Sequence, residues 1–318
     1  MRREINFRFK QQDGVALLLV LWVLILLMVL GMSFSYMTRT ELEAGHYFNR
    51  RLKDDMLLEG AIQRAVLELL HARKSPDAED IWDLNGGLNL LKEDNFEMEI
   101  RIIPESSKVD LNRASDVILK GLLAAIGVDA ETQDVIADSL LDWRDPDDLH
   151  RLNGAENDYY HSLDRPYDCK NGNLDSTEEL LLVRGVTREI FYGNGEKPGL
   201  RDYVTVFSDS DRININTAAR EVLLSLPGMD EDTADAVIEY RKNKQIKNSA
   251  ELQDALGGLY AGISGYVTFS AGNTYRVIAR RKGKAFGIEA TIQINGNDFT
   301  IRKWKETVKQ IEKKHEES

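Results

Sequence analysis

Hydrophobic residues are concentrated near the start of this chain, in a run from Gly14 to Thr38 that contains no charged side chain. An α-helix rises about 1.5 Å per residue, so roughly 20 apolar residues suffice to cross the hydrocarbon core of a bilayer. Val15 to Phe34 supplies this length without a proline. The pattern predicts a helix that can span a membrane.

The helical pattern continues beyond this run, with no proline between Arg39 and Arg73. Apolar residues recur there at spacings of three and four, which is typical of a helix with one buried face. They are Leu58, Ile62, Ala65, Val66 and Leu69. We therefore expect a single long helix whose second half packs under a sheet and which ends before Pro76. Two helices broken near Gly45 or Gly60 are the alternative.

Period-two alternation predicts the sheet. Phe96, Met98, Ile100 and Ile102 alternate with charged residues, as in a half-buried strand. The expected partners come much later in the chain, at 275–279 and 286–294, joined by a turn at 281–284. The charged segment 302–318 is expected to form a short surface helix and a tail.

The segment between the strands has a helical pattern and contains an internal repeat. Val109-Asp-Leu-Asn-Arg-Ala-Ser115 is similar to Ile213-Asn-Ile-Asn-Thr-Ala-Ala219, and 180–185 resembles a partial third copy. Each full copy precedes an aliphatic helix and a glycine turn. Side chains such as Asn112 and Asn216 are expected to cap these helices.

The charge of the chain argues against a general nucleic-acid binder. The formal net charge is −12, and because the first 38 residues carry four basic and two acidic side chains, the remainder carries −14. Nucleic-acid affinity comes largely from Lys and Arg that neutralise phosphates. The only cysteine, Cys169, excludes an intramolecular disulfide.

The second copy of the repeat resembles the helix-hairpin-helix of exported DNA receptors. A working hairpin presents backbone N–H groups to a phosphate at a Gly-hydrophobic-Gly turn. Here Asp230 replaces the second glycine of the turn Pro227-Gly228-Met229-Asp230, and Glu231 and Asp232 follow. These carboxylates would repel a phosphate, which favours a packing role, and a membrane-anchored DNA receptor remains the alternative function.

The segment 142–179 holds eleven carboxylates against four basic residues. Such crowding is unfavourable unless water or a cation separates the charges. Calcium takes six to eight hard oxygen ligands, and Asp168, Asn171 and Asp175 around Gly172 offer them at short spacing. A solvated acidic loop is the alternative, because the spacing does not match a full EF-hand loop.

No catalytic constellation is recognisable in the sequence. The five histidines form neither an HExxH motif nor a close pair of the zinc-ligand type, and no phosphate loop or nucleophile elbow occurs. We expect a protein that is not an enzyme, with a surface enzyme held by an uncut helix as a competing class.

The boundary between the basic leader and the apolar run resembles the cleavage site of type III leader peptides, found in prepilins and pseudopilins. Gly14 directly precedes Val15, as at the site where prepilin peptidase cuts on the cytoplasmic side. Most members of that class carry Glu five residues after the cut, where this chain has Leu19. A cleavable signal peptide and an ordinary membrane anchor are the other interpretations of the run.

These motifs together resemble the general secretion pathway protein K family, minor pseudopilins of type II secretion systems. The order of Gly14, Leu19, DLNRAS, LLDWRDPDD, NGAENDYY, LDSTEELLLVRG and ININTA carries the resemblance. It implies a calcium site in the inserted domain. The candidate ligands are Asp142, Asp145, Glu156, Asp168, Asn171 and Asp175.

The resemblance also implies a place and partners. The chain would be a single-pass protein of the Gram-negative inner membrane with its bulk in the periplasm, methylated at the Val15 amine and located at the pseudopilus tip after assembly. Its partners would be other minor pseudopilins, the major pseudopilin, prepilin peptidase, the inner-membrane assembly platform and secreted proteins, but no nucleic acid. It would help to initiate or limit pseudopilus assembly for export of folded proteins.

The expected fold is α+β: a pilin-like long N-terminal helix and antiparallel sheet, with a large inserted α-helical subdomain of the SAM-like or helix-hairpin-helix-like kind. The expected segments are a leader at 1–14, the long helix at 15–75 with its membrane part at 15–38, the first part of the sheet at 76–110, the inserted domain at 111–265, the return strands at 266–301 and a charged tail at 302–318.

Overall fold

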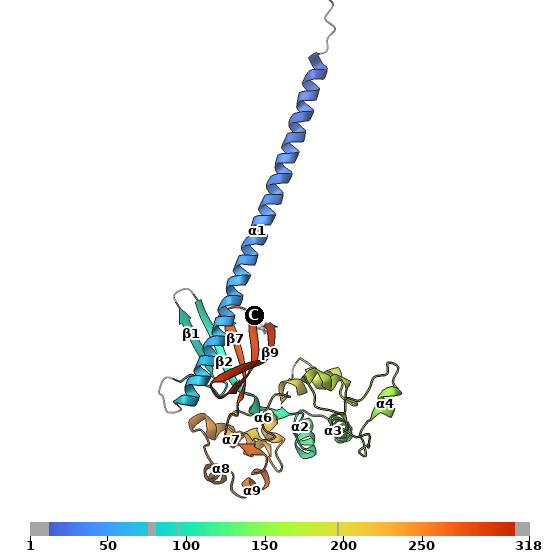
Figure 1. Ribbon diagram of the computed structural model, residues 1–318, viewed down its shortest axis with the longest axis vertical. Helices are drawn as coiled ribbons and strands as arrows, with labels where there is room; N and C mark the ends of the chain where they lie inside the picture. Colours follow the sequence, from blue (N-terminus) through green and yellow to red (C-terminus); the bar gives the residue numbers. More distant parts are fainter. Residues whose placement is uncertain (1–12, 76–80, 94–95, 196, 309–318) are drawn as a thin grey trace, which may run out of the picture. The chain divides into compact units, whose positions relative to one another are not determined.

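The computed structural model describes residues 13–75, 81–93, 96–195 and 197–308 (Figure 1). The chain divides into two units, Met1–Leu57 and Leu58–Ser318. Helix α1 (Asp13–Lys74) begins in the first unit and ends in the second. The prediction of one long helix is confirmed, and α1 continues through Gly45 and Gly60. Gly14 lies within α1, whereas the basic residues ahead of it lie outside the described residues.

The part of α1 in the first unit exposes its apolar side chains. Leu17, Trp22 and Phe34 are each 73% exposed, and their apolar neighbours up to Met37 are exposed as well. Among the described residues, this is one helix that is long and apolar enough to cross a membrane. So much apolar surface is unstable in water and has to be covered by lipid or by other apolar helices.

The second unit contains a five-stranded antiparallel sheet with the order β1-β2-β7-β8-β9. The strands are β1 (Leu88–Glu93), β2 (Phe96–Pro104), β7 (Thr274–Arg281), β8 (Phe286–Asn295) and β9 (Asp298–Val308). The α1 residues Leu58, Ile62 and Leu69 are buried, as are the alternate residues Met98, Ile100 and Ile102 of β2. The end of α1 thus packs on the sheet, and the predicted α+β fold is confirmed.

Strand β9 corrects one prediction. Residues 302–308, expected to form a helix, continue the strand that begins at Asp298 and pairs with β8 along its whole length. The alternation was hidden because one residue of β9 has no partner: Lys303 lies opposite Thr291 and Ile301 opposite Ile292, which leaves Arg302 extra. A bulge of this kind shifts the period by one residue. The short strand β1 was not predicted.

The inserted domain runs from β2 to β7, two neighbouring strands of the sheet. Its helices are η1 (Glu105–Ser107), α2 (Asp116–Ala125), α3 (Ala130–Arg144), α4 (Asn157–His161), η2 (Thr177–Leu182), α5 (Arg188–Tyr192), η3 (Leu200–Asp202), α6 (Arg220–Leu224), α7 (Glu231–Asn243), α8 (Ser249–Leu256), η4 (Gly257–Leu259) and α9 (Tyr260–Ile263). Two parallel strand pairs tie it together, β3 (Val109–Asp110) with β4 (Val204–Thr205) and β5 (Ile213–Asn214) with β6 (Val267–Thr268).

The repeat recurs in the hydrogen bonds, although not as expected. Asn112 does not cap α2; its side chain accepts from Leu174 N at 2.7 Å and donates to Leu174 O at 3.0 Å. Asn216 bonds Ile246 N and O in the same way, at 2.8 Å each. The capping prediction is wrong, because each amide side chain pairs with a distant backbone segment instead.

Candidate metal centre

Three segments of the inserted domain meet at the end of helix α3. They are the last turn of α3 with Asp142 and Asp145, the start of α4 with Glu156, and the loop that contains Asn171. Backbone contacts hold them together. The carbonyl of Trp143 accepts from Gly172 N at 3.4 Å, and Asn157 Oδ1 accepts from Cys169 N at 2.8 Å. The fold therefore gathers part of the acidic segment at one place.

Asp142 is fully buried and holds the loop around Arg151 in position through its two carboxylate oxygens. Its Oδ1 atom accepts from Arg151 Nη1 at 2.5 Å, and its Oδ2 atom accepts from Arg151 N at 3.2 Å. A Cβ atom on Gly154 would lie 1.8 Å from Asp142 Oδ2, so only glycine allows the chain to pass this close. Because both oxygens are engaged by the protein, Asp142 positions the loop rather than presenting a free ligand.

Three carboxylates approach one another here, those of half-buried Asp145, exposed Asp147 and buried Glu156. One oxygen from each of these carboxylates lies within 4.8 Å of the others. Arg151 Nη1 holds Asp145 Oδ2 at 2.6 Å, which leaves Asp145 Oδ1 buried without a hydrogen-bond partner. Three carboxylates at this separation repel one another unless a cation lies between them.

Glu156 is a buried carboxylate whose charge the protein does not offset with hydrogen bonds. Its side chain is 2% exposed, and neither carboxylate oxygen has a hydrogen-bond partner. Burial, followed by repulsion from Asp142, raises the pKa of Glu156 to about 7. A buried carboxylate without partners is expensive to keep charged, and a bound cation removes that cost.

Asn171 offers a further oxygen ligand from the loop that contacts the end of α3 through Gly172. Its backbone adopts a left-handed conformation with φ 46°, which Asn tolerates better than most residues. Its Nδ2 atom donates to Asp148 Oδ1 at 3.2 Å, whereas Asn171 Oδ1 is buried without a partner. The set of buried open oxygens therefore comes from Asp145, Glu156 and Asn171.

Two of the predicted ligands lie elsewhere. The side chain of Asp168 is 86% exposed and pairs with His161 Nε2 at 2.7 Å, and that of Asp175 is 89% exposed and pairs with Lys170 Nζ at 2.7 Å. The structure places Asp147, which is outside the predicted set, beside Asp145 and Glu156. The sequence signal for Asp147 was its position two residues after Asp145, across Pro146, since the side chains on either side of a turn residue can point to the same place.

The neighbouring thiol and imidazoles make a transition-metal centre a poor fit. Burial raises the pKa of the Cys169 thiol to about 12, and its sulfur is not among the three ligand atoms, from Asp145, Asp147 and Glu156, that lie within 4.8 Å of one another. His150 pairs with Asp158 at 2.9 Å and His161 with Asp168. The donors that remain are carboxylate and amide oxygens, which fit a hard cation such as calcium.

In the turn before α7, where a DNA-binding hairpin would offer free backbone N–H groups, the Asp230 side chain caps the helix. Asp230 Oδ1 accepts from Thr233 N at 2.8 Å at the start of α7, and hydrogen bonds from Thr233 hold the pKa of Asp230 below its usual value. Glu231 and Asp235 flank this turn and pair with Arg220. The position where a hairpin would receive a phosphate is thus taken by a carboxylate.

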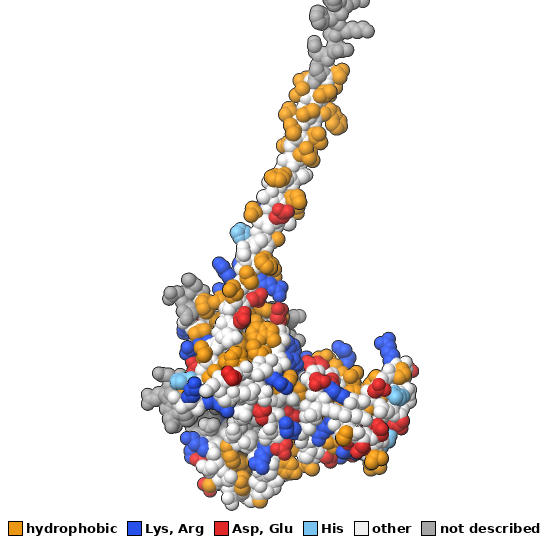
Figure 2. Space-filling view, in the orientation of Figure 1, with side chains coloured by type: hydrophobic (Ala, Val, Ile, Leu, Met, Phe, Trp, Pro, Cys, Tyr) orange, Lys and Arg blue, Asp and Glu red, His pale blue; other side chains and the backbone are white. Residues whose placement is uncertain are grey.

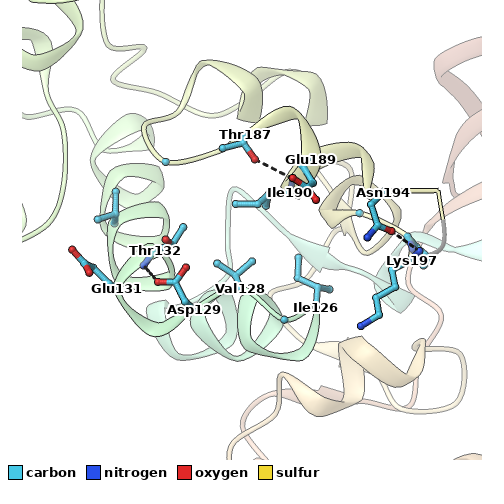
Figure 3. Close-up of a pocket in the computed structure, with 16 residues that line it drawn as sticks. Ile126, Val128, Asp129, Glu131, Thr132, Thr187, Glu189, Ile190, Asn194 and Lys197 are labelled. Carbon is cyan, nitrogen blue, oxygen red and sulfur yellow. Dashed lines mark hydrogen bonds between the residues drawn. The ribbon is translucent and has the colours of Figure 1, made fainter.

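A cavity of about 670 Å³ lies between the α2–α3 turn and the region of α5 (Figure 3). Three of its polar side chains are engaged locally: Asp129 accepts from Thr132 N, Thr187 Oγ1 from Ile190 N and Asn194 Oδ1 from Lys197 N. The described residues that line it include no His, Cys, Ser or Tyr. Among the described residues that line this cavity, no nucleophile is hydrogen-bonded to a base.

The fold and this centre define a class: a pilin-like α+β protein whose sheet is interrupted by a helical domain with an acidic cluster. Comparisons with known proteins show what the chain is similar to. Residues 88–209 match the family "Type II secretion system (T2SS), protein K", and residues 208–257 match a helix-hairpin-helix motif. The resemblance found in the sequence is confirmed, and the chain is related to the protein K family of type II secretion systems.

Curated relatives agree with this family. The chain is 27% identical over 196 residues to a putative type II secretion system protein K of Escherichia coli K12, covering 57% of this chain and 60% of the relative. It is 32% identical over 153 residues to type II secretion system protein K of Aeromonas hydrophila, covering 46% and 44%. The matches thus span about half the length of these relatives.

A solved structure has the same fold. A chain from the crystal structure of the GspK-GspI-GspJ complex of the enterotoxigenic Escherichia coli type 2 secretion system superposes with a TM-score of 0.61. The alignment covers 81% of this chain and 97% of that chain, at 15% sequence identity. At this identity the comparison establishes the fold.

Proposed function

We propose that this chain is a minor pseudopilin of a type II secretion system, located at the pseudopilus tip, where it helps to initiate or limit assembly. The match of residues 88–209 to protein K is the observation that carries this proposal. Other minor pseudopilins are the proposed partners, since the matching fold comes from a complex named for GspK, GspI and GspJ. The test is to delete the chain and to measure type II secretion. We expect secretion to be lost and to be restored by the full chain, and normal secretion without the chain contradicts the proposal.

Processing follows from the proposed role. Prepilin peptidase cuts after Gly14, Val15 becomes the new N-terminus, and its amine is a candidate for methylation. The apolar part of α1 remains in the mature protein and holds it in the inner membrane as a single span, with the bulk in the periplasm. Intact mass after co-expression with a prepilin peptidase tests this step, and a product that still begins at Met1 rules it out.

The absence of an acidic residue at Leu19 supports a position at the tip. In the pseudopilin class, a carboxylate at this place is thought to pair with the amine of a neighbouring subunit, because an unpaired charge is costly in an apolar fibre core. A subunit with Leu19 leaves no such carboxylate unpaired when it has no neighbour above. The bulky inserted domain would then cover the end of the fibre. No reaction is part of this role.

We propose further that the cluster of Asp145, Asp147, Glu156 and Asn171 binds calcium. The open buried oxygens and the raised pKa of Glu156 support it, because a divalent cation would neutralise the mutual repulsion of three carboxylates. Thermal unfolding of the full chain in detergent provides the test. Added calcium is expected to raise Tm relative to EGTA, and an unchanged Tm would exclude this site.

A membrane-anchored DNA receptor is the second candidate function, and the helix-hairpin-helix match at residues 208–257 is the observation that favours it. The carboxylate of Asp230 at the start of α7 and the net charge of −12 oppose it. Gel retardation with duplex DNA at moderate salt separates the two functions, since the pseudopilin proposal expects no retained complex.

A further inference from the structure

The inserted domain leaves the sheet and returns to it through two short segments. Residues 105–108 follow β2, and residues 269–273 precede β7. The segments lie side by side, because Ser106 Oγ donates to Ala271 O at 3.0 Å. The second contains three small residues in a row, Ser270 to Gly272, and Gly272 has the left-handed φ of 75° that suits glycine. Two adjacent connections of this kind can act as a hinge, so other contacts have to fix the domain.

Asp209 bonds the inserted domain to the sheet beside this hinge. It lies in the loop between β4 and β5. Its Oδ2 atom accepts from Asn273 N at 3.0 Å and from Thr274 Oγ1 at 3.1 Å, and its Oδ1 atom accepts from Gln293 Nε2 at 3.3 Å. Thr274 on β7 and Gln293 on β8 lie directly opposite each other. One carboxylate of the inserted domain therefore holds two neighbouring strands of the sheet.

The loop that carries Asp209 is itself fixed within the inserted domain. Buried Asp110 accepts from Ser208 N through Oδ2 at 2.9 Å and from Asn112 N through Oδ1 at 2.8 Å. Ser208 Oγ also donates to Ser210 O at 2.9 Å, which closes a turn around Asp209. Because the loop is held on both sides of Asp209, the contacts of its carboxylate with the strands limit the movement of the whole domain.

The end of α1 bonds the same corner of the sheet. Arg73 Nη2 donates to Asn273 Oδ1 at 3.0 Å, and Arg73 Nη1 donates to Ile294 O at 3.2 Å. Asn273 is held in place by Ile294 N, which donates to its carbonyl at 2.8 Å. Asn273 thus bonds Arg73 of α1 through its side chain and Asp209 of the inserted domain through its backbone. Two opposite charges from distant parts of the chain are connected through this one residue.

We propose that Asp209, acting with Arg73 through Asn273, is a latch that fixes the orientation of the inserted domain against the sheet and the end of α1. A cavity of about 120 Å³ at this joint, lined by Asp209 and by residues with hydroxyl side chains such as Ser106 and Ser270, gives the hinge room to move when the latch is broken. Figure 2 shows charged side chains of both signs on the inserted domain, so its orientation decides which of them a neighbouring subunit meets. That consequence rests on the proposed function, whereas the latch itself does not.

The test measures a distance within the full chain in detergent. Nitroxide labels are attached at exposed positions of α1 and α3 through Gln63→Cys and Glu131→Cys, and the native Cys169 is buried and stays unlabelled. We expect a single narrow distance distribution for this chain and a broader, shifted one after Asp209→Ala, because the domain then moves on its hinge. Asp211→Ala is the matched control, since it removes a carboxylate from an exposed position two residues away and leaves the three hydrogen bonds of Asp209 in place.

A second variant keeps the test decisive if Asp209→Ala does not fold. Thr274→Val removes one donor to Asp209 and leaves the carboxylate in place, so it should broaden the distribution less. An unchanged distribution in both variants, or an equal change in Asp211→Ala, overturns the latch.

Secretion separates the latch from the proposed function. If the wild-type chain does not restore secretion to a strain that lacks it, the pseudopilin role is contradicted, while the distances still decide on the latch. If the wild type restores secretion, Asp209→Ala should restore less than Asp211→Ala. Equal restoration by the two variants overturns the use of the latch in assembly.

Discussion

Arg144 and Arg241 occupy equivalent positions in the two copies of the repeat. Arg144 donates to the carbonyls of Leu111 and Ala114 at 2.6 and 2.7 Å. Arg241 donates to the corresponding carbonyls of Ile215 and Ala218 at 2.8 and 2.7 Å. In each copy, a guanidinium at the end of the second helix closes the turn that precedes the first helix.

Replacement of either arginine should destabilise the inserted domain. Arg144→Met or Arg241→Met leaves two carbonyl groups without their donors, and hydrogen bonds to a charged group contribute about 1.5–3 kcal/mol. We expect a loss of roughly 2–3 kcal/mol for each variant, measured as a lower denaturant midpoint at unchanged slope. Arg144→Lys and Arg241→Lys should retain only part of this stability, since a lysine ammonium cannot reach both carbonyls as the forked guanidinium does. A midpoint equal to the wild type would contradict this role.

Gly121 should not tolerate alanine. A Cβ atom there would lie 2.5 Å from Ser225 O and 2.9 Å from Ser225 Cα, at the contact between α2 and the end of α6. Forcing these helices apart is expected to cost about 1–3 kcal/mol. Gly60→Ala in α1 is the control, because nothing lies within 4 Å and alanine stabilises a helix interior by about 0.5–1 kcal/mol. Opposite shifts of Tm are expected, and parallel shifts would contradict the packing.

Lys108 should make stability depend on pH. Burial, with repulsion from Arg276, lowers the pKa of Lys108 to about 7, whereas the unfolded value is about 10.4. Glu105, Asp202 and Glu289 oppose this shift without cancelling it. Between pH 7 and about 10.4, Lys108 binds a proton in the unfolded chain but not in the folded one. The free energy of unfolding therefore rises with pH in this range, by at most about 1.4 kcal/mol per pH unit.

The variant that isolates this effect is Lys108→Met. It should be more stable than the wild type at pH 7, and the difference should shrink as the pH approaches 10, because the wild type recovers stability there. Chemical unfolding of both chains at several pH values measures the difference directly. A constant difference across this range would show that Lys108 keeps its charge in the folded protein.

Glu156→Gln should have opposite effects with and without calcium. In EGTA, removal of a buried carboxylate without partners is expected to raise Tm by a few degrees. With calcium the wild type gains stability and the variant gains little, since a neutral amide is a weaker ligand. Asp175→Asn is the matched control, because its exposed side chain lies outside the cluster and should leave the calcium-induced shift unchanged. A full calcium shift in Glu156→Gln would assign the ion to other residues.

The local pattern of the sequence was sufficient for the elements. Apolar residues that recur about every 3.6 positions predicted α1, and those that recur every two positions predicted the strands within β2, β7 and β8. Burial of one face requires an apolar residue at each of these positions, so the period is visible in the sequence. The repeat also showed Asn112 and Asn216, but the sequence did not show what they bind. The backbone groups that they bond lie 62 and 30 residues further along the chain. No local pattern encodes that separation.

The sequence by itself determined the apolar run from Gly14, the strand–insert–strand order and the acidity of the segment 142–179, since these follow from composition and period. The tertiary structure alone decided which carboxylates meet. It brings one oxygen each of Asp145, Asp147 and Glu156 within 4.8 Å of one another and pairs Asp168 and Asp175 with His161 and Lys170 instead, because the chain path around Asp142 and Gly154 sets which carboxylates lie side by side. In the same way, a single unpaired residue in β9, visible only in its pairing with β8, places Ile301 and Trp304 on one face.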